Sequence, residues 1–208
     1  MHASKYAKVL GMALTALLVV ACDNGDDDPQ PPPPPPGEVN LLEGLSEMNA
    51  SYVTDTTYWN HFQTDGDGGA EQGTVTAGTY AGMTGDVLQL TSTNFGTADW
   101  NYQIVAGTGQ ANNYSAKSFT LVPGKVYTIS YKAAASNNGS IKAYLKINDT
   151  TDAGSEVADL TSTTQTFTSD PITVTADQPV TFVINVGALP ANTIVYLDDV
   201  TLTEADAD

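Results

Sequence analysis

The sequence predicts an all-β domain built as an antiparallel β-sandwich or jelly roll. Short runs rich in β-branched and aromatic residues recur along the chain, and Gly, Asn, Asp or Pro separate them. Helical periodicity is nearly absent, which argues against a fold that contains many helices. Many short strands with turn residues between them are typical of sandwiches and jelly rolls.

Residues 1–21 have the composition of a secretory signal peptide. A short positive region precedes the apolar run Val9–Ala21, which is too short to be a comfortable membrane span. The run ends in Val-Val-Ala-Cys at Cys22, which resembles the lipobox of bacterial lipoproteins and implies cleavage before Cys22 and lipidation of that residue. The alternative is a soluble secreted protein with an incidental cysteine.

Cys22 is the only cysteine, so no intramolecular disulfide can form, and lipidation gives this lone thiol a use. Acyl chains on Cys22 would hold the protein on a membrane surface without spanning it. We therefore expect a lipid-anchored protein of the bacterial cell envelope, at the outer membrane or the cell surface.

An acidic and proline-rich stretch, residues 22–38, separates this segment from the domain. Its proline run Pro31–Pro36 favours polyproline II at about 3.1 Å per residue, so it spans on the order of 20 Å. The aspartates before the prolines repel one another and stay solvated. We expect a semi-rigid tether at 22–38, one domain at 39–204 and an acidic tail at 205–208.

The charge balance excludes nucleic acid as a partner. Without the two lysines of the signal peptide, five lysines stand against 24 acidic residues, a formal charge of 5 − 24 = −19. Nucleic-acid binding needs basic surface to displace phosphate counterions. Strong acidity suits neutral ligands and divalent cations instead. We expect a monomer.

Nine runs are the clearest expected strands, and in several of them apolar and polar residues alternate. This alternation places one face of a strand in the core and leaves the other in water. The wet face of one strand carries Tyr144 between two lysines and is a candidate ligand platform. The nine runs are Asp86–Thr91, Asp99–Val105, Ser118–Leu121, Lys125–Ala133, Ser140–Asn148, Gln165–Thr168, Ile172–Thr175, Pro179–Val186 and Thr193–Thr203.

The last of these strands carries two adjacent aspartates. On a regular pleated strand Asp198 shares a face with Val200 and Leu202, so we expect Asp198 to point inward with them. A buried carboxylate needs a cation or several donors to offset its desolvation. The pattern leaves three roles open for Asp198: a metal ligand, a hydrogen-bonded core carboxylate, or a solvated edge residue.

Five segments of residues 39–204 occur in an order known from one group of proteins. They are Asn40-Leu41-Leu42, Trp59, Trp100-Asn101-Tyr102-Gln103-Ile104, Leu121–Ala133 and Val195–Leu202. Their order and spacing resemble the carbohydrate-binding modules of families 4 and 9, which adopt a galactose-binding-like jelly roll. The resemblance implies noncovalent binding of a β-glycan or related polysaccharide or oligosaccharide, and a structural calcium near the two chain ends. The chain departs from the family after Leu42, where no aromatic follows, and at Lys132, where many members carry an exposed tryptophan.

Sugar recognition needs flat aromatic faces for pyranose rings and polar groups for their hydroxyls. Trp100 is the first candidate platform, although Trp100, Tyr102 and Ile104 align on one strand face and could instead be core residues. The candidate ligand-binding residues are Trp100, Gln103, Asn101, Tyr144 and Tyr102.

The resemblance also suggests a ligand set for Ca²⁺, which binds carboxylate and carbonyl oxygens. Asp198 on the last strand could reach the start of the domain, where two glutamates lie. The candidate metal ligands are Asp198, Glu47 and Glu43.

Catalysis has little support in the residue types. His61 is the only histidine beyond the signal peptide, and no nucleophile-elbow motif accompanies it. Carboxylate pairs could hydrolyse a glycoside, but acidic residues are so common here that their presence says little. We expect a binding protein that is not an enzyme. The main alternative is a structural or adhesion sandwich that binds a protein or an envelope component. Exposed aromatics on the wet sheet face would separate the two.

Overall fold

The structure is a computed structural model, and it describes residues 38–42, 59–63, 73–85, 87–110, 113–147 and 151–207. The regular structure of these residues is β-strand apart from one short 3-10 turn, η1 (Asp99–Asn101). The predicted all-β fold is therefore confirmed. The predicted ligands Glu43 and Glu47, like the predicted signal peptide and most of the predicted tether, lie outside the described residues. Within the described ranges, no helix is long and apolar enough to cross a membrane.

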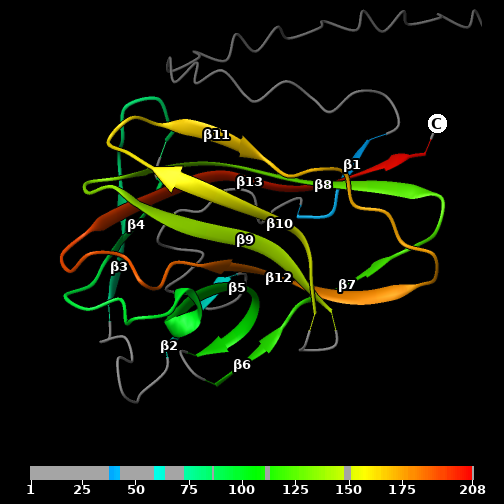
Figure 1. Cartoon of the computed structure of the whole chain (residues 1–208), viewed down its shortest axis with the longest axis horizontal. Helices are drawn as coiled ribbons and strands as arrows, with labels where there is room; N and C mark the ends of the chain where they lie inside the picture. Colours follow the sequence, from blue (N-terminus) through cyan, green and yellow to red (C-terminus); the bar gives the residue numbers. More distant parts are fainter. Residues whose placement is uncertain are drawn as a thin grey trace, which may run out of the picture. The chain divides into compact units, whose positions relative to one another are not determined.

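The strands form two antiparallel sheets that face each other (Figure 1). The first sheet has the order β11-β8-β13-β4-β3, and β1 pairs with the C-terminal half of β13. Its strands are β1 (Val39–Asn40), β3 (Thr74–Gly78), β4 (Val87–Thr91), β8 (Lys125–Ala135), β11 (Gln165–Thr168) and β13 (Ile194–Asp206).

The second sheet has the order β10-β9-β12-β5-β2, with β7 paired to β12 and β6 paired to β5. Figure 1 shows β9, β10 and β12 below β8, β11 and β13, so the two layers enclose one core. The strands are β2 (Trp59–Gln63), β5 (Tyr102–Gln110), β6 (Asn113–Ala116), β7 (Ser118–Leu121), β9 (Gly139–Ile147), β10 (Thr151–Leu160) and β12 (Gln178–Asn185).

The core forms where the apolar faces of the alternating strands meet. Tyr127 and Ile129 of β8, Leu145 of β9 and Phe182 of β12 are all fully buried in it. The Trp59 ring meets the Phe182 ring edge-on, with centroids 5.9 Å apart. Burying each such side chain stabilises the fold by about 1.5–3 kcal/mol. The alternation in the sequence is therefore the main source of the sandwich.

One strand prediction failed at a place where the apolar pattern misleads. The run Ile172–Thr175 was expected to be a strand, but only Ile172 makes an isolated bridge, to Tyr127. The opposite case is β10, which is a strand in the structure but was not predicted. This edge strand contains Gly154 and several acidic residues, and it buries only Ala158 and Leu160. An edge strand with one neighbour needs few apolar residues, so its periodicity is weak.

The last strand departs from regular geometry at a β-bulge. Its pairing with β8 shifts between Asp198 and Thr201, and Asp199 has a positive φ of 49°. Leu197 is buried in the core, so Asp198 lies on the opposite face, and the bulge then returns Val200 to the core. The expectation that Asp198 shares a face with Val200 was wrong, because the extra residue in the bulge reverses the alternation.

Candidate functional site

Trp100 lies in the turn η1, directly before β5, and its side chain is 53% exposed. The turn is held by Asn101, whose Oδ1 accepts hydrogen bonds from the backbone N of Thr97 at 2.9 Å and of Ala98 at 2.7 Å. Gly96 permits this arrangement, since its φ is 83° and a Cβ there would collide with Asn101. The chain turns tightly here and leaves the indole of Trp100 at the surface.

The residues on either side of this turn have separate environments. Tyr102 begins β5 and is fully buried in the core, and Asn101 is buried with its carboxamide oxygen engaged in the turn. Trp100 does not align with Tyr102 and Ile104, because the expected strand at Asp99–Val105 starts only at Tyr102. Of Trp100, Asn101 and Tyr102, only Trp100 is exposed at the surface.

A row of hydrogen-bonding side chains crosses the outer face of the second sheet. Asn185 of β12 pairs in register with Gln103 of β5 and with Lys142 of β9, so these three side chains lie side by side. We call the row the polar strip and define it as Asp99, Gln103, Asn185, Tyr144, Lys142 and Asp152. Two of its members, Gln103 and Tyr144, are among the residues predicted from the sequence.

Asn185 is the centre of the polar strip. Its Oδ1 accepts hydrogen bonds from Gln103 Nε2 at 2.7 Å and from the Tyr144 hydroxyl at 3.3 Å. Its Nδ2 donates to Asp99 Oδ2 at 3.2 Å, while Gln103 Nε2 also reaches the Tyr144 hydroxyl at 3.2 Å. Each side chain therefore fixes the rotamer of the next, which orients their remaining donors and acceptors before any ligand arrives.

Tyr144 serves as a hydrogen-bonding group and not as an open aromatic surface. Its side chain is only 4% exposed, because it packs with Val105 and Val183 in a small cluster on the outer face of the sheet. Burial, with the nearby Asp152 carboxylate second, raises the pKa of Tyr144 to about 12, so the hydroxyl stays protonated and can donate. The ammonium of Lys142 lies 4.9 Å from its ring centroid. Tyr144 is therefore not the exposed platform that the sequence suggested.

Both ends of the polar strip carry charged side chains that have partners within the domain: Asp99 is hydrogen-bonded and Lys142 is ion-paired. Asp99 Oδ1 accepts from the backbone N of Trp100 at 2.8 Å, which ties the strip to the turn that carries Trp100. At the other end Lys142 Nζ lies 2.5 Å from Asp152 Oδ2. Between these ends the groups are two carboxamides and a phenol, a set that exchanges hydrogen bonds with neutral hydroxyls without a large desolvation penalty.

Sequence reasoning missed Asp99, Asn185, Lys142 and Asp152. Asn185 had a usable signal, because it is the one polar residue at the end of the apolar run Val180–Val186. Asp152 lies on the unpredicted strand β10, opposite Lys146. No pattern in the sequence specifies the register that brings β5, β12 and β9 together.

Asp198 lies on the outer face of the first sheet, buried to 3% exposure. Its Oδ2 accepts a hydrogen bond from the backbone N of Thr84 at 3.1 Å. Burial, followed by the nearby Asp199 carboxylate, raises the pKa of Asp198 from 3.8 to about 6. Lys132 Nζ pairs with Asp199 at 2.7 Å. Among the residues that the structure describes, no three acidic, His or Cys side chains gather as a metal site would require.

The comparisons with known proteins agree with this architecture. A solved family 4 carbohydrate-binding module superposes with a TM-score of 0.52 and 28% identity, over 74% of this chain and 90% of that one. The chain has the jelly-roll fold of a carbohydrate-binding module. No protein-family model matches it, and no curated protein does either.

Other solved structures match at lower sequence identity. The N-terminal cellulose-binding domain of a Cellulomonas fimi β-1,4-glucanase matches at 16% identity and a TM-score of 0.46, over 77% of this chain and 98% of that domain. An arabinose-bound α-L-arabinofuranosidase matches at 11% identity and a TM-score of 0.50, over 81% of this chain but only 26% of the enzyme. The likeness to that enzyme concerns one part of it and the fold alone.

Proposed function

We propose that the domain binds a neutral polysaccharide or oligosaccharide, without chemistry, on the outer face of the second sheet. The observation that carries this proposal is the polar strip, in which Gln103, Asn185 and Tyr144 hold one another in fixed orientations. The fold shared with a family 4 carbohydrate-binding module supports it. A β-glycan remains the expected ligand class within this proposal.

Trp100 and the polar strip would contact different parts of the sugar. The exposed indole at the Asp99 end offers an apolar face to the C–H side of a pyranose ring. The half-buried carboxamide of Gln103 would exchange hydrogen bonds with sugar hydroxyls, and the buried Asn185 would hold it in an orientation that costs little further ordering. An exposed tryptophan beside the strip also favours this function over the structural or adhesion alternative.

The arrangement of carboxylates supports a binding protein in preference to a glycosidase. Hydrolysis of a glycoside needs a pair of carboxyl groups about 5–9.5 Å apart, one of them an acid with a raised pKa. The two carboxylates of the strip are each engaged, Asp99 by Asn185 and Asp152 by Lys142. Asp198, whose pKa is raised, lies on the outer face of the other sheet.

Affinity electrophoresis of residues 38–208 through gels that contain xylan, mixed-linkage β-glucan or hydroxyethylcellulose tests the proposal. We expect retardation in at least one gel, and Trp100→Ala should abolish it. Thr175→Val, at an exposed threonine outside the strip, is the matched control and should migrate as the unmodified domain does. Free migration in these gels and no signal on a wider glycan array would overturn the function.

Calcium is proposed as a structural ion on the strength of Asp198 and the resemblance alone. The described residues supply one buried carboxylate there, with a backbone amide and a lysine nearby, so they do not make a complete site by themselves. The other expected ligands, Glu43 and Glu47, lie outside the described residues. A fall in thermal stability on adding a chelator, reversed by Ca²⁺, is the expected result if the ion is bound.

We further propose that the protein is anchored in the cell envelope through lipid on Cys22, as the sequence pattern suggests. Mass spectrometry of the protein extracted from membranes should then find acyl chains on a new N-terminal cysteine. Cys22→Ala should release the protein from the membrane fraction. A membrane-bound Cys22→Ala variant would contradict the anchor and leave the carbohydrate proposal untouched.

A further inference from the structure

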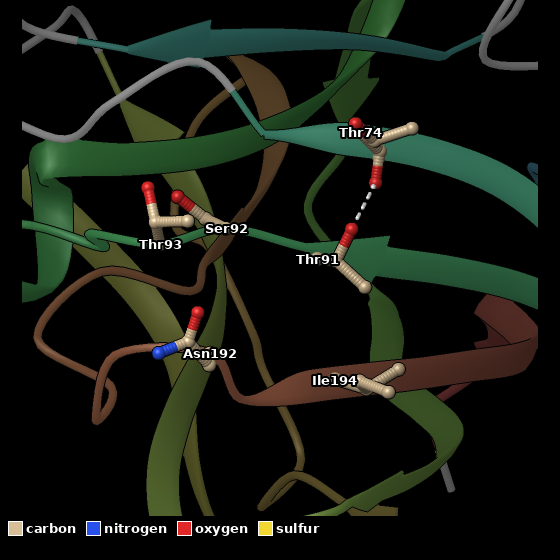
Figure 2. A pocket seen from close by; sticks show the side chains of 6 residues that line it. All are labelled: Thr74, Thr91, Ser92, Thr93, Asn192 and Ile194. Carbon is tan, nitrogen blue, oxygen red and sulfur yellow. Dashed lines mark hydrogen bonds between the residues drawn. The ribbon is translucent and has the colours of Figure 1, made fainter.

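A pocket of about 380 Å³ lies at one end of the first sheet (Figure 2), and none of its lining residues belongs to the polar strip. Its walls come from three neighbouring strands and the segments that join them. Thr74 belongs to β3 and Thr91 ends β4, while Ile194 begins β13. The other lining residues are Ser92 and Thr93, which follow β4, and Asn192, which precedes β13.

The lining residues are polar but carry no charge. Four of the six have hydroxyl groups, Asn192 has a carboxamide, and Ile194 and the threonine methyl groups are apolar. This neutrality stands out in a chain with a formal charge of −17 and 24 acidic residues. With no cation to offset a ligand anion and no carboxylate to bind a metal, the pocket suits an uncharged ligand with many hydroxyl groups.

Internal hydrogen bonds fix the walls of the pocket. The backbone N of Asn192 donates to the carbonyl O of Ser92 at 2.9 Å, which joins the two loops that face each other. Ser92 Oγ donates to the carbonyl O of Asn94 at 2.7 Å, and Thr91 Oγ1 donates to the carbonyl O of Thr74 at 3.4 Å, the bond drawn in Figure 2. A pocket with fixed walls loses little freedom when a ligand enters.

Asn192 is placed for contact with a ligand by its backbone conformation. Its φ is 59°, in the left-handed region that asparagine tolerates better than most residues. Figure 2 shows its carboxamide across the pocket from Ser92 and Thr93. Nearby, Ala188 also has a positive φ, of 58°, so the loop before β13 holds two residues in this less favourable conformation.

We propose that this pocket is a second binding site, for a single uncharged sugar unit. Its volume is near the lower end of the 300–1,000 Å³ that is usual for small-molecule sites, about what one sugar ring requires. The exposed side chains of Thr74, Thr93 and Asn192 can donate to and accept from sugar hydroxyls, and the apolar groups can contact the C–H face. Because the lining residues include no aromatic side chain, the affinity is modest, with a Kd of about 1 mM or weaker. The site stands independently of the polar strip.

Titration of the ¹⁵N-labelled full chain with methyl β-D-glucopyranoside or methyl β-D-xylopyranoside, followed by NMR, tests this site. We expect saturable shifts of the backbone amides of Ser92, Thr93 and Asn192. Methyl β-D-glucuronide, which carries a carboxylate, should bind at least about tenfold more weakly, since no cation lines the pocket. Glycerol should produce no saturable shift. Equal binding of the glucuronide, or equal shifts with glycerol, would overturn the proposed ligand class.

Asn192→Gly is the most informative variant, because glycine keeps the positive φ without strain and removes only the carboxamide. It should weaken binding of the glycoside about tenfold. Thr175→Val, an exposed threonine elsewhere, should leave the titration unchanged. Unchanged binding by Asn192→Gly, or no saturable shift with either glycoside, would overturn the site. Asn192→Gly should keep its affinity for polysaccharide at the polar strip, so the two proposals can fail separately.

Discussion

Replacement of Asp198 by asparagine should change the pH dependence of stability in a defined direction. The carboxyl group is buried, and its pKa rises from 3.8 in the unfolded chain to about 6 in the folded domain. Asparagine has nearly the same shape and can still accept the hydrogen bond from the backbone N of Thr84. The variant therefore removes the titration and little else.

The sign of this pH dependence follows from whether the folded or the unfolded state binds the proton of Asp198 more tightly. Between the two pKa values the folded domain holds the proton more tightly than the unfolded chain, so its stability falls as the pH rises through about 6. The difference between the two pKa values corresponds to about 3 kcal/mol in the free energy of unfolding. In EDTA, Asp198→Asn should be more stable than the unmodified domain by up to about 3 kcal/mol at pH 8, and this advantage should vanish near pH 4.

Urea denaturation at several pH values between 4 and 8 measures this difference directly. Asp177→Asn is the matched control, since Asp177 is exposed and is not among the groups that shift the pKa of Asp198. It should change the stability by less than about 1 kcal/mol. An advantage of Asp198→Asn that does not vary with pH, or a variant that is less stable at pH 8 in EDTA, would refute the reasoning. If Ca²⁺ binds Asp198, calcium at 100 times its Kd should stabilise the unmodified domain by about 2.7 kcal/mol and so cancel most of the advantage of the variant.

Three further substitutions test other parts of the molecule. Trp100→Ala should lower the affinity for polysaccharide about tenfold or more and leave the melting temperature unchanged, as binding titration and calorimetry would show. Asn185→Ala should cost about 1–3 kcal/mol of stability in urea denaturation as well as affinity, because it leaves its strip partners without hydrogen bonds; an unchanged stability would contradict the network. Gly154→Ala should lower stability by more than Gly124→Ala, because both glycines have a positive φ but only at Gly154 would a Cβ collide with Ile172; equal losses in thermal denaturation would refute the steric account.

The strands that the sequence identified well are those that bury one full face. In β8, β9 and β12 apolar and polar residues alternate along most of the strand, which made their core residues recognisable from the sequence. The edge strand β10 was missed because it buries only two apolar side chains and pairs with one neighbour. Apolar periodicity reflects burial, so a strand that buries few apolar side chains has only a weak periodic pattern in the sequence.

The candidate site was only partly predictable for a different reason. Gln103 and Tyr144 were named from the family resemblance and the wet strand face, and the structure brings them within hydrogen-bonding distance across β12. Their common partner Asn185 was not identified, because which strand lies between two others depends on long-range pairing. The assignment of Tyr144 as an open platform was wrong, since its burial comes from neighbours that are distant in sequence.

By itself, the sequence determined the all-β class, most of the core faces and the charge of the surface, because these depend on residue type and local periodicity. The tertiary structure decided which side chains meet. The bulge at Asp198–Thr201 reversed the face of a carboxylate, and the turn η1 separated Trp100 from Tyr102. Both features arise from how strands fit against their partners, and a one-residue change of register moves a side chain from core to surface.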